Sequence, residues 1–164
     1  MTTVLDNGLR LVEQQLADDR HLAVFITTSV DCAEPQVSVV NAAVIDHPTS
    51  GERVIALVAR RGAKLTNLRR HARATIVARA GWEWAAASGP VELSGPDDPN
   101  PGIDPEAQRQ LLRDIYHAAG GHHPDLDAYD LAMLDERRCV VIIHPTRTWT
   151  NSAGSEHLEP QDTP

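Results

Sequence analysis

The chain has 164 residues and a formal net charge of −8, with 41% hydrophobic residues and only 4% aromatics. It is long enough to bury the core of one domain, and its net negative charge argues against general nucleic-acid binding, which needs a broad basic face. No apolar run approaches the ~20 residues of a membrane span, the N-terminus lacks a signal-peptide pattern and the two distant cysteines fit reduced thiols, so we expect a cytoplasmic protein without membrane contact.

The first third of the chain predicts one helix followed by three strands. Leu5, Leu9, Val12 and Leu16 recur at the spacing of one helical face. Short β-branched runs between turn residues then indicate strands, and the third run is apolar enough to be covered on both faces. The expected elements are a helix over residues 5–17 and strands over residues 21–28, 36–45 and 53–59.

The rest of the chain predicts a short helix, two strands, two further helices and a last strand. Gly89-Pro90 interrupts the longest strand and suggests a bend of the kind found at barrel corners. Asp104 is a good N-cap for the next helix, and Gly120-Gly121 ends that helix. The expected elements are helices over residues 63–70, 105–119 and 125–136, and strands over residues 73–78, 82–93 and 138–144.

This order of elements predicts a mainly β protein of the α+β class. Runs of strands with segregated helices do not form a doubly wound sheet. Six short strands with bends favour a six-stranded closed or split β-barrel with peripheral helices. We assign residues 1–149 to this domain. Residues 150–164 are polar, acidic and contain proline, so we expect a disordered tail there.

A basic segment stands out in this acidic chain. Residues 53–79 contain seven arginines, one lysine and no acidic residue, so the segment carries +8 and the remainder −16. The lysine, Lys64, is the only one in the sequence. Arginine, lysine and the free N–H groups of a helix start are the donors that a phosphate needs, and Gly62 lets the backbone approach an anion closely. From the residues alone, a solvated basic helix face explains the same charges equally well.

Other sites of chemistry are not identifiable from sequence patterns. His117, His122 and His123 cluster near the Gly-Gly turn without a metal-ligand spacing, so we interpret them as surface or capping residues and predict no metal site. There is no nucleophile elbow and no dinucleotide fingerprint, and no catalytic acid or base can be named. Trp82 and Trp84 are two positions apart, so their side chains point to the same face of the predicted strand. We expect Trp82 to pack in the core or in a dimer, and Trp84 is available for ring stacking.

The basic segment resembles a motif of the flavin-binding split-barrel superfamily, which includes pyridoxamine 5'-phosphate oxidases and deazaflavin (coenzyme F-420) dependent reductases. In that family the third strand enters a Ser/Gly-x-Lys turn, followed by Asn-Leu-Arg-Arg-x-Pro-Arg and another strand. Here the turn is Gly62-Ala63-Lys64, and residues 67–73 follow the second pattern. Residues 119–138 look like the deazaflavin branch in particular. The resemblance covers most of residues 5–149.

The resemblance implies a homodimer with a cofactor in each of two grooves between subunits. Arg60 or Arg61, together with Lys64, would hold the cofactor phosphate. The ribityl chain and ring would lie along the second strand, and two tryptophans would complete the site, one of them from the partner subunit. The residues carried over for the chain, ring and tryptophan positions are Ser38, Val40, Asn41, Trp84 and Trp149.

Three departures from the family pattern bear on the cofactor. Ala63 stands where FMN-binding relatives often have arginine, and Val58 stands where they have a hydroxyl. Ala72 replaces a proline that serves only the turn. The first two departures weaken the match to FMN binding and leave deazaflavin binding, or loss of the cofactor, more open. The first hypothesis is an oxidoreductase that uses coenzyme F-420 on a small organic substrate. An FMN-dependent oxidase or reductase, and a non-catalytic cofactor- or tetrapyrrole-binding protein, stay open as alternatives.

Overall fold

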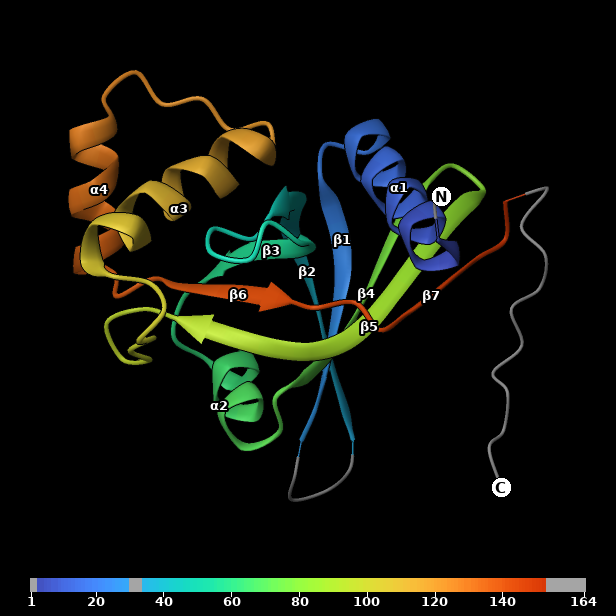
Figure 1. The fold of residues 1–164 in the computed structure, drawn as a ribbon, viewed down its shortest axis with the longest axis horizontal. Coiled ribbons are helices and arrows are strands. Elements are labelled where there is room, and N and C mark those ends of the chain that lie inside the picture. Colours follow the sequence, from blue (N-terminus) through green and yellow to red (C-terminus); the bar gives the residue numbers. More distant parts are fainter. Residues whose placement is uncertain (1–2, 30–33, 153–164) are drawn as a thin grey trace.

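The structure is a computed structural model that describes residues 3–29 and 34–152. It contains four helices and seven strands within those residues (Figure 1). The helices are α1 (Val4–Asp18), α2 (Ala63–Arg70), α3 (Pro105–Ala118) and α4 (Leu126–Asp135). The strands are β1 (Leu22–Thr28), β2 (Pro35–Asp46), β3 (Arg53–Ala59), β4 (Arg73–Ala80), β5 (Glu83–Ser94), β6 (Cys139–Ile143) and β7 (Arg147–Thr150).

Six antiparallel strands close into a barrel. Neighbouring strands pair in the order β4-β1-β2-β3-β6-β5, and an additional β4–β5 pairing closes the ring. The seventh strand, β7, pairs with β5 as an extra edge strand. The predicted six-stranded split barrel of the α+β class is therefore confirmed.

The barrel closes because β5 changes partner halfway along its length. Its first part pairs with β4 as far as Pro90, and from Val91 onward it pairs with β6. At the change of partner, a Cβ added to Gly89 would lie 1.8 Å from the backbone oxygen of His144. Only glycine permits this approach of the two backbones. The bend predicted at Gly89-Pro90 therefore has a specific packing cause.

Two apolar clusters hold the elements together. The larger fills the barrel interior, where α1 contributes Leu9, Val12 and Leu16, and α2 contributes Leu65 and Leu68. The smaller lies between the outer face of β3 and β6 and the helices α3 and α4. As a result, β3 and β6 are buried on both faces, as the apolar sequence of β3 predicts. Figure 1 shows α1 and α2 at opposite ends of the barrel.

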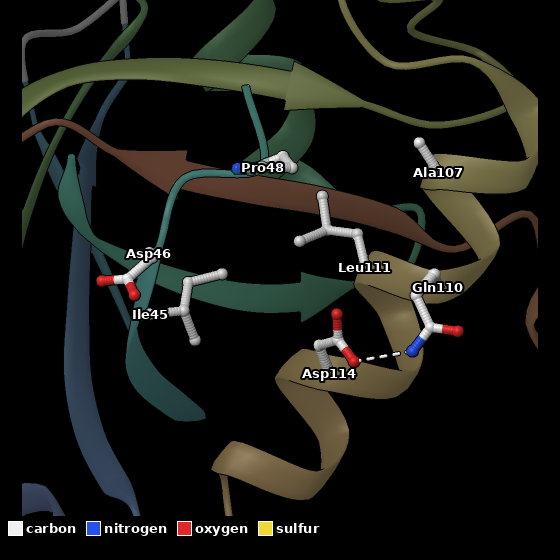
Figure 2. A pocket seen from close by; sticks show the side chains of 7 residues that line it. All are labelled: Ile45, Asp46, Pro48, Ala107, Gln110, Leu111 and Asp114. Atoms are coloured by element: carbon white, nitrogen blue, oxygen red, sulfur yellow. Dashed lines mark hydrogen bonds between the residues drawn. The ribbon is translucent and has the colours of Figure 1, made fainter. Parts of the chain in front are cut away.

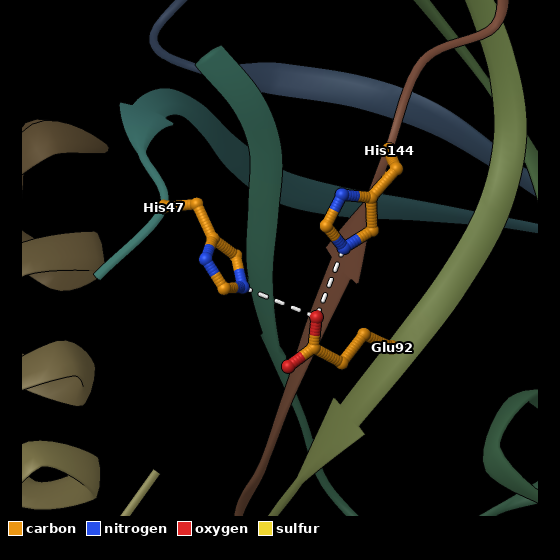
Figure 3. A group of neighbouring side chains, drawn as sticks. All are labelled: His47, Glu92 and His144. Atoms are coloured by element: carbon orange, nitrogen blue, oxygen red, sulfur yellow. Dashed lines mark hydrogen bonds and ion pairs between the residues drawn. The ribbon is translucent and has the colours of Figure 1, made fainter. Parts of the chain in front are cut away.

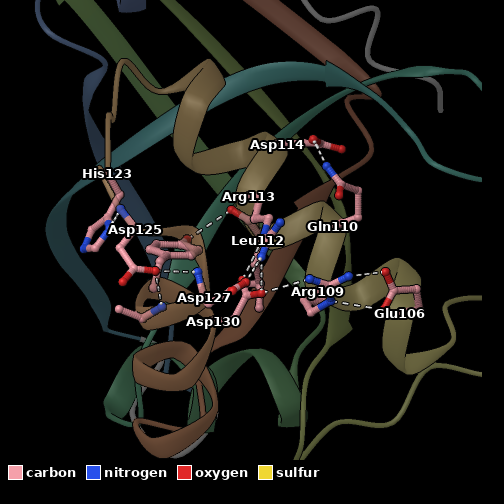
Figure 4. A network of polar contacts seen from close by, with 12 residues as sticks. Glu106, Arg109, Gln110, Leu112, Arg113, Asp114, His123, Asp125, Asp127 and Asp130 are labelled. Atoms are coloured by element: carbon pink, nitrogen blue, oxygen red, sulfur yellow. Dashed lines mark hydrogen bonds and ion pairs between the residues drawn. The ribbon is translucent and has the colours of Figure 1, made fainter.

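Ion pairs fix α4 against α3 (Figure 4). Arg113 Nε donates to Asp130 Oδ1 at 2.9 Å, and Arg109 NH1 donates to Asp130 Oδ2 at 3.1 Å. The hydrogen bond from Arg113 holds the pKa of Asp130 below its ordinary value. At the start of α4, the Asp125 N–H donates to His123 Nδ1 at 3.1 Å. His123 thus has the capping role expected of the histidine cluster.

Two sequence expectations require correction. The core packing expected for Trp82 is wrong, because this residue lies in the turn before β5 and is 89% exposed in the single chain; the alternative, packing in a dimer, stays a prediction. Strand β7 was not predicted, and it ends at Thr150, one residue past the expected domain limit. Asn151 and Ser152 are also hydrogen bonded, while residues 153–164, the rest of the expected tail, lie outside the described residues.

Among residues 3–29 and 34–152, no helix combines the length and apolarity that crossing a membrane requires.

Candidate cofactor site

The turn that leads into α2 is open for an anion. Gly62 is the N-cap of α2 with φ 155°, and as a glycine it has no side chain to cap the N–H groups of the first turn. Lys64 lies in that first turn and is half-buried. A cation here is unfavourable to the helix dipole unless an anion is bound nearby. The sequence expectation of an anion site at this turn is therefore consistent with the local geometry.

Helix α2 is anchored to the hairpin of β1 and β2. The Asn67 side-chain amide donates to Thr27 Oγ1 at 3.2 Å and to Gln36 Oε1 at 3.1 Å. Leu65 and Leu68 on the same helix are buried in the barrel core. The position of the Gly62 turn relative to β2 is thus fixed by both polar and apolar contacts.

An acidic loop neutralises part of the basic segment. Arg69 forms a two-point ion pair with Asp98, and its hydrogen bonds hold the pKa of the Asp98 carboxyl below the ordinary value. Asp97 accepts from Arg137 Nε at 3.1 Å and lies 3.5 Å from Arg61 NH2. The hydrogen bond from Arg137 is the main cause that lowers the pKa of Asp97. The +8 charge of the segment is therefore not all available to a ligand.

At the α2 turn itself, the cations left for a ligand are Arg60 and Lys64. Arg60 is exposed, and neither side chain forms an ion pair within the part of the chain that the structure describes. Arg61, by contrast, is 71% exposed in its side chain but already lies beside Asp97. Of the two arginines that the sequence left undecided, Arg60 is the one without a competing carboxylate.

The three residues expected along β2 do not share one face. Burial alternates along β2, with Val37, Val39 and Asn41 exposed and Ser38 and Val40 half-buried. Val40 packs against the barrel core. The Asn41 side chain points to the other face, where its Nδ2 donates to Arg20 O at 3.2 Å. A ligand on the outer face of β2 would contact Asn41 and lie on the far side of the strand from Ser38 and Val40.

The two tryptophans do share a face, and it is the outer face of the barrel. Trp149 pairs with Ala86 across β5 and β7, so its side chain points to the same side as Ala86 and Trp84. The intervening Ala85 and Ala87 belong to the barrel core. Arg147 stacks over the Trp149 ring at 4.9 Å from its centroid.

Within one chain, these tryptophans are far from the Lys64 turn. Trp84 pairs with Arg79 near the β4–β5 turn, whereas Arg73, at the opposite end of β4, closely follows α2. Eight strand residues span about 25 Å. The tryptophans and the cations of the α2 turn therefore lie toward opposite ends of β4, and one subunit does not bring them together.

A separate pocket of about 330 Å³ lies between the end of β2 and α3 (Figure 2). Its lining residues are Ile45, Asp46, Pro48, Ala107, Gln110, Leu111 and Asp114. Asp114 accepts a hydrogen bond from Gln110 Nε2 at 2.8 Å. None of the sequence-predicted site residues lines this pocket, and its lining includes no residue of the α2 turn.

Sequence patterns missed one cluster of titratable side chains. His47, Glu92 and His144 meet on the outer side of β5 and β6 (Figure 3). They are separated by 45 and 52 residues, so no local spacing connects them.

The remaining thiol in the described region, Cys139, is 2% exposed, and burial raises its pKa to about 12, so it is no nucleophile.

Comparison with solved structures identifies the fold class. A conserved hypothetical protein of Mycobacterium tuberculosis matches with a TM-score of 0.60 and 17% identity over 92% of this chain and 84% of that one. A pyridoxamine 5'-phosphate oxidase-related, FMN-binding protein of Nostoc punctiforme matches with a TM-score of 0.59 and 10% identity, over 92% of this chain and 85% of that one. A heme binding protein of Mycobacterium smegmatis matches with 0.58 and 16%, over 91% of this chain and 55% of that one.

No family model matches the chain. The molecule therefore has the split-barrel fold found in FMN-binding proteins related to pyridoxamine 5'-phosphate oxidase, as the sequence resemblance implied. Heme binding proteins share that fold. At these identities the likeness extends to the fold alone.

Proposed function

We propose that this protein is an oxidoreductase that binds a flavin-type cofactor, coenzyme F-420 before FMN, with the cofactor phosphate at the start of α2. The observation that carries the proposal is Lys64 in the uncapped first turn of that helix. It has no carboxylate partner in the described region, although the loop at Asp97 and Asp98 supplies partners for cations nearby. Arg60 would add a second charge-assisted contact.

The homodimer that the sequence resemblance implies is part of this proposal. Val37 and Val39 are 59% and 66% exposed on the outer face of β2, in its first half, whereas α3 packs near the other end of the strand at Ile45. A second copy packed on this face would bury both side chains. It would also bring its own Trp84 and Trp149 toward the first subunit, which cannot itself join them to Lys64.

In the proposed reaction, the bound cofactor would supply hydride transfer to a small organic substrate. The chain's own groups would bind and orient. Lys64, Arg60 and the N–H groups of the α2 turn would hold the phosphate. Asn41 and the tryptophans would border the ring, and a dimer contact through Val39 would exclude water.

The choice between the two flavin cofactors rests on Ala63. Val58, the other departure from the FMN-binding pattern, packs against the α3–α4 cluster, so its missing hydroxyl has a packing cause. Ala63 is exposed at the start of α2, where an arginine could reach a phosphate. A non-catalytic cofactor- or tetrapyrrole-binding protein is the second candidate, and the heme binding neighbour favours keeping it.

Spectroscopic titration of the purified protein tests the proposal. We expect saturable quenching of coenzyme F-420 fluorescence, about 10- to 100-fold weaker in Lys64→Ala because a charge-assisted hydrogen bond is lost. Tighter binding of FMN would favour the FMN-dependent alternative. Binding of heme with no flavin binding at all would favour the tetrapyrrole alternative.

A further inference from the structure

Three side chains from separate strands converge on one point of the barrel wall. His47 directly follows β2, Glu92 lies in the second half of β5, and His144 directly follows β6. Figure 3 shows both imidazoles pointing their Nε2 atoms at the same carboxylate oxygen of Glu92. The distances to Glu92 Oε2 are 3.1 Å from His47 and 2.9 Å from His144.

The geometry of the cluster suits a metal ion. The three ligand atoms all lie within 4.8 Å of one another. In a tetrahedral site with metal–ligand distances of about 2.0–2.1 Å, ligand atoms are roughly 3.3 Å apart. The spacing of the histidine nitrogens from Glu92 is close to that value, so an ion can enter after only a small outward adjustment of the side chains.

Supporting contacts orient two of the three ligands. Asn100 Nδ2 donates to Glu92 Oε1 at 2.5 Å, which leaves Oε2 directed at the histidines. His47 is 7% exposed, and its Nδ1 lies 3.2 Å from Thr49 Oγ1. A histidine that binds a metal through Nε2 commonly donates its Nδ1–H to such an oxygen. Glu92 and His47 therefore have outer contacts of the kind found in metal sites.

The barrel bend places His144 beside Glu92. The His144 N–H donates to Pro90 O at 2.9 Å, and Gly89 lets the two backbones approach. This contact joins backbone atoms. His144 directly follows β6, whose five residues are all buried, so the fold fixes the position of His144. A preformed site binds an ion without a large ordering cost.

We propose that His47, Glu92 and His144 bind a divalent transition metal ion, with Zn²⁺ as the fitting class. Two imidazoles and one carboxylate form a ligand set that Zn²⁺ takes with a fourth position open to water. Mg²⁺ and Ca²⁺ prefer sites made only of oxygen atoms. The side chains of Glu92 and His144 are 28% and 30% exposed, so solvent reaches the cluster.

A metal-free hydrogen-bonded triad is the competing arrangement, and it needs a different proton position. The Thr49 and Ser50 N–H groups lie 3.4 and 3.3 Å from His47 Nδ1, at the long end of hydrogen-bond range. In this structure both N–H groups donate to Nδ1, which puts the His47 proton on Nε2, where it blocks a metal. The metal site requires the proton on Nδ1, donated to Thr49 Oγ1. Thr49→Val should therefore weaken the metal site, which uses the Thr49 hydroxyl as an acceptor, but not the metal-free triad, which uses the Thr49 backbone N–H.

Calorimetric titration of the chelator-treated full-length protein with Zn²⁺, followed by the visible spectrum with Co²⁺, tests the proposal. We expect one ion per chain and a tetrahedral Co²⁺ spectrum. Glu92→Gln and His144→Gln should each lose at least roughly 100-fold in affinity, a larger loss than for an outer-contact residue, and Thr49→Val about 10-fold. His122→Gln, at an exposed histidine outside the cluster, should bind as the parent protein does.

Circular dichroism of each variant checks that the barrel is folded before metal is added. The proposal is overturned if the parent protein binds neither Zn²⁺ nor Co²⁺ at one equivalent. It is equally overturned if a folded His144→Gln variant binds them unchanged. Loss of binding in His122→Gln, with the cluster variants unaffected, would place the metal at the α3–α4 turn and also contradict it. None of these outcomes depends on cofactor binding at α2.

Discussion

Arg69 on α2 holds Asp98 in a two-point ion pair, with Nε to Oδ1 at 2.7 Å and NH2 to Oδ2 at 2.8 Å. The Asp98 side chain is only 11% exposed, so the pair is better shielded than a surface salt bridge. It ties α2 to the loop that follows β5. The turn that carries Lys64 is therefore supported from the side opposite its contact with β1 and β2.

This ion pair predicts a stability difference that depends on pH. Because Asp98 has a lowered pKa in the folded protein, its stabilising effect is present above the ordinary pKa of about 3.9 and is lost as pH falls through the lowered value. Asp98→Asn should reduce the free energy of unfolding by about 1–3 kcal/mol at pH 7. Urea denaturation from pH 7 downward should show this difference shrinking.

The matched control is Asp135→Asn, at an exposed carboxylate at the end of α4. Its unfolding free energy should stay within about 0.5 kcal/mol of the parent value, since among residues 3–29 and 34–152 no arginine or lysine forms an ion pair with it. A difference for Asp98→Asn that persists unchanged below pH 3 would contradict the electrostatic explanation.

The barrel bend predicts a large effect of a single methyl group. In Gly89→Ala the added Cβ would meet the His144 backbone oxygen at 1.8 Å, and a backbone cannot move aside as a side chain can. We expect a loss of about 3 kcal/mol or more, the upper part of the overpacking range. Thermal denaturation measures it. The control is Gly102→Ala, whose nearest neighbour is a side-chain oxygen at 3.4 Å.

The sequence predicted most of the barrel because its signals are local. The apolar run at β3 and the helix formers at α2 have the expected bounds, and Gly89-Pro90 marks the bend. Strand β7 was missed because it is short and polar, and it becomes a strand only through pairing with β5. Core packing of Trp82 was wrongly expected because alternation along a strand does not show where the preceding turn ends.

Site residues were harder to predict because they depend on which face each strand presents. The Gly62 turn and its lysine follow from local sequence, whereas the split of Ser38 and Val40 from Asn41 depends on how β2 alternates against the core. The pairing of Arg61 with Asp97 links residues 36 positions apart. Likewise, His47, Glu92 and His144 meet only because three strand ends meet.

The exposed face of β2 predicts the oligomeric state. If a second copy packs on Val39, then Val39→Asp would place an unpaired carboxylate in the interface at a cost of several kcal/mol. Light scattering coupled to gel filtration should show a dimer for the parent protein and a monomer for the variant. Leu131→Asp, at a 67% exposed leucine on α4, should remain dimeric. A monomeric parent protein would exclude the proposed two-subunit site.

The two arginines before α2 should contribute unequally to cofactor binding. Arg61 already lies 3.5 Å from Asp97, whereas Arg60 has no carboxylate partner in the described region. Arg60→Ala should therefore weaken coenzyme F-420 binding about 10-fold, and Arg61→Ala less than about 3-fold. Fluorescence titration of both variants side by side measures the ratio. Equal losses would show that Arg61 leaves Asp97 to contact the ligand.

The central claim is that the α2 turn holds the phosphate of a flavin-type cofactor. The most direct measurement is the affinity of the parent protein and of Lys64→Ala for coenzyme F-420, FMN and heme, determined in parallel at two salt concentrations. We predict that the parent protein binds coenzyme F-420 most tightly. Lys64→Ala should lose about 10- to 100-fold and show a weaker dependence on salt. Unchanged affinity in folded Lys64→Ala, or no flavin binding by the parent protein, would contradict the claim.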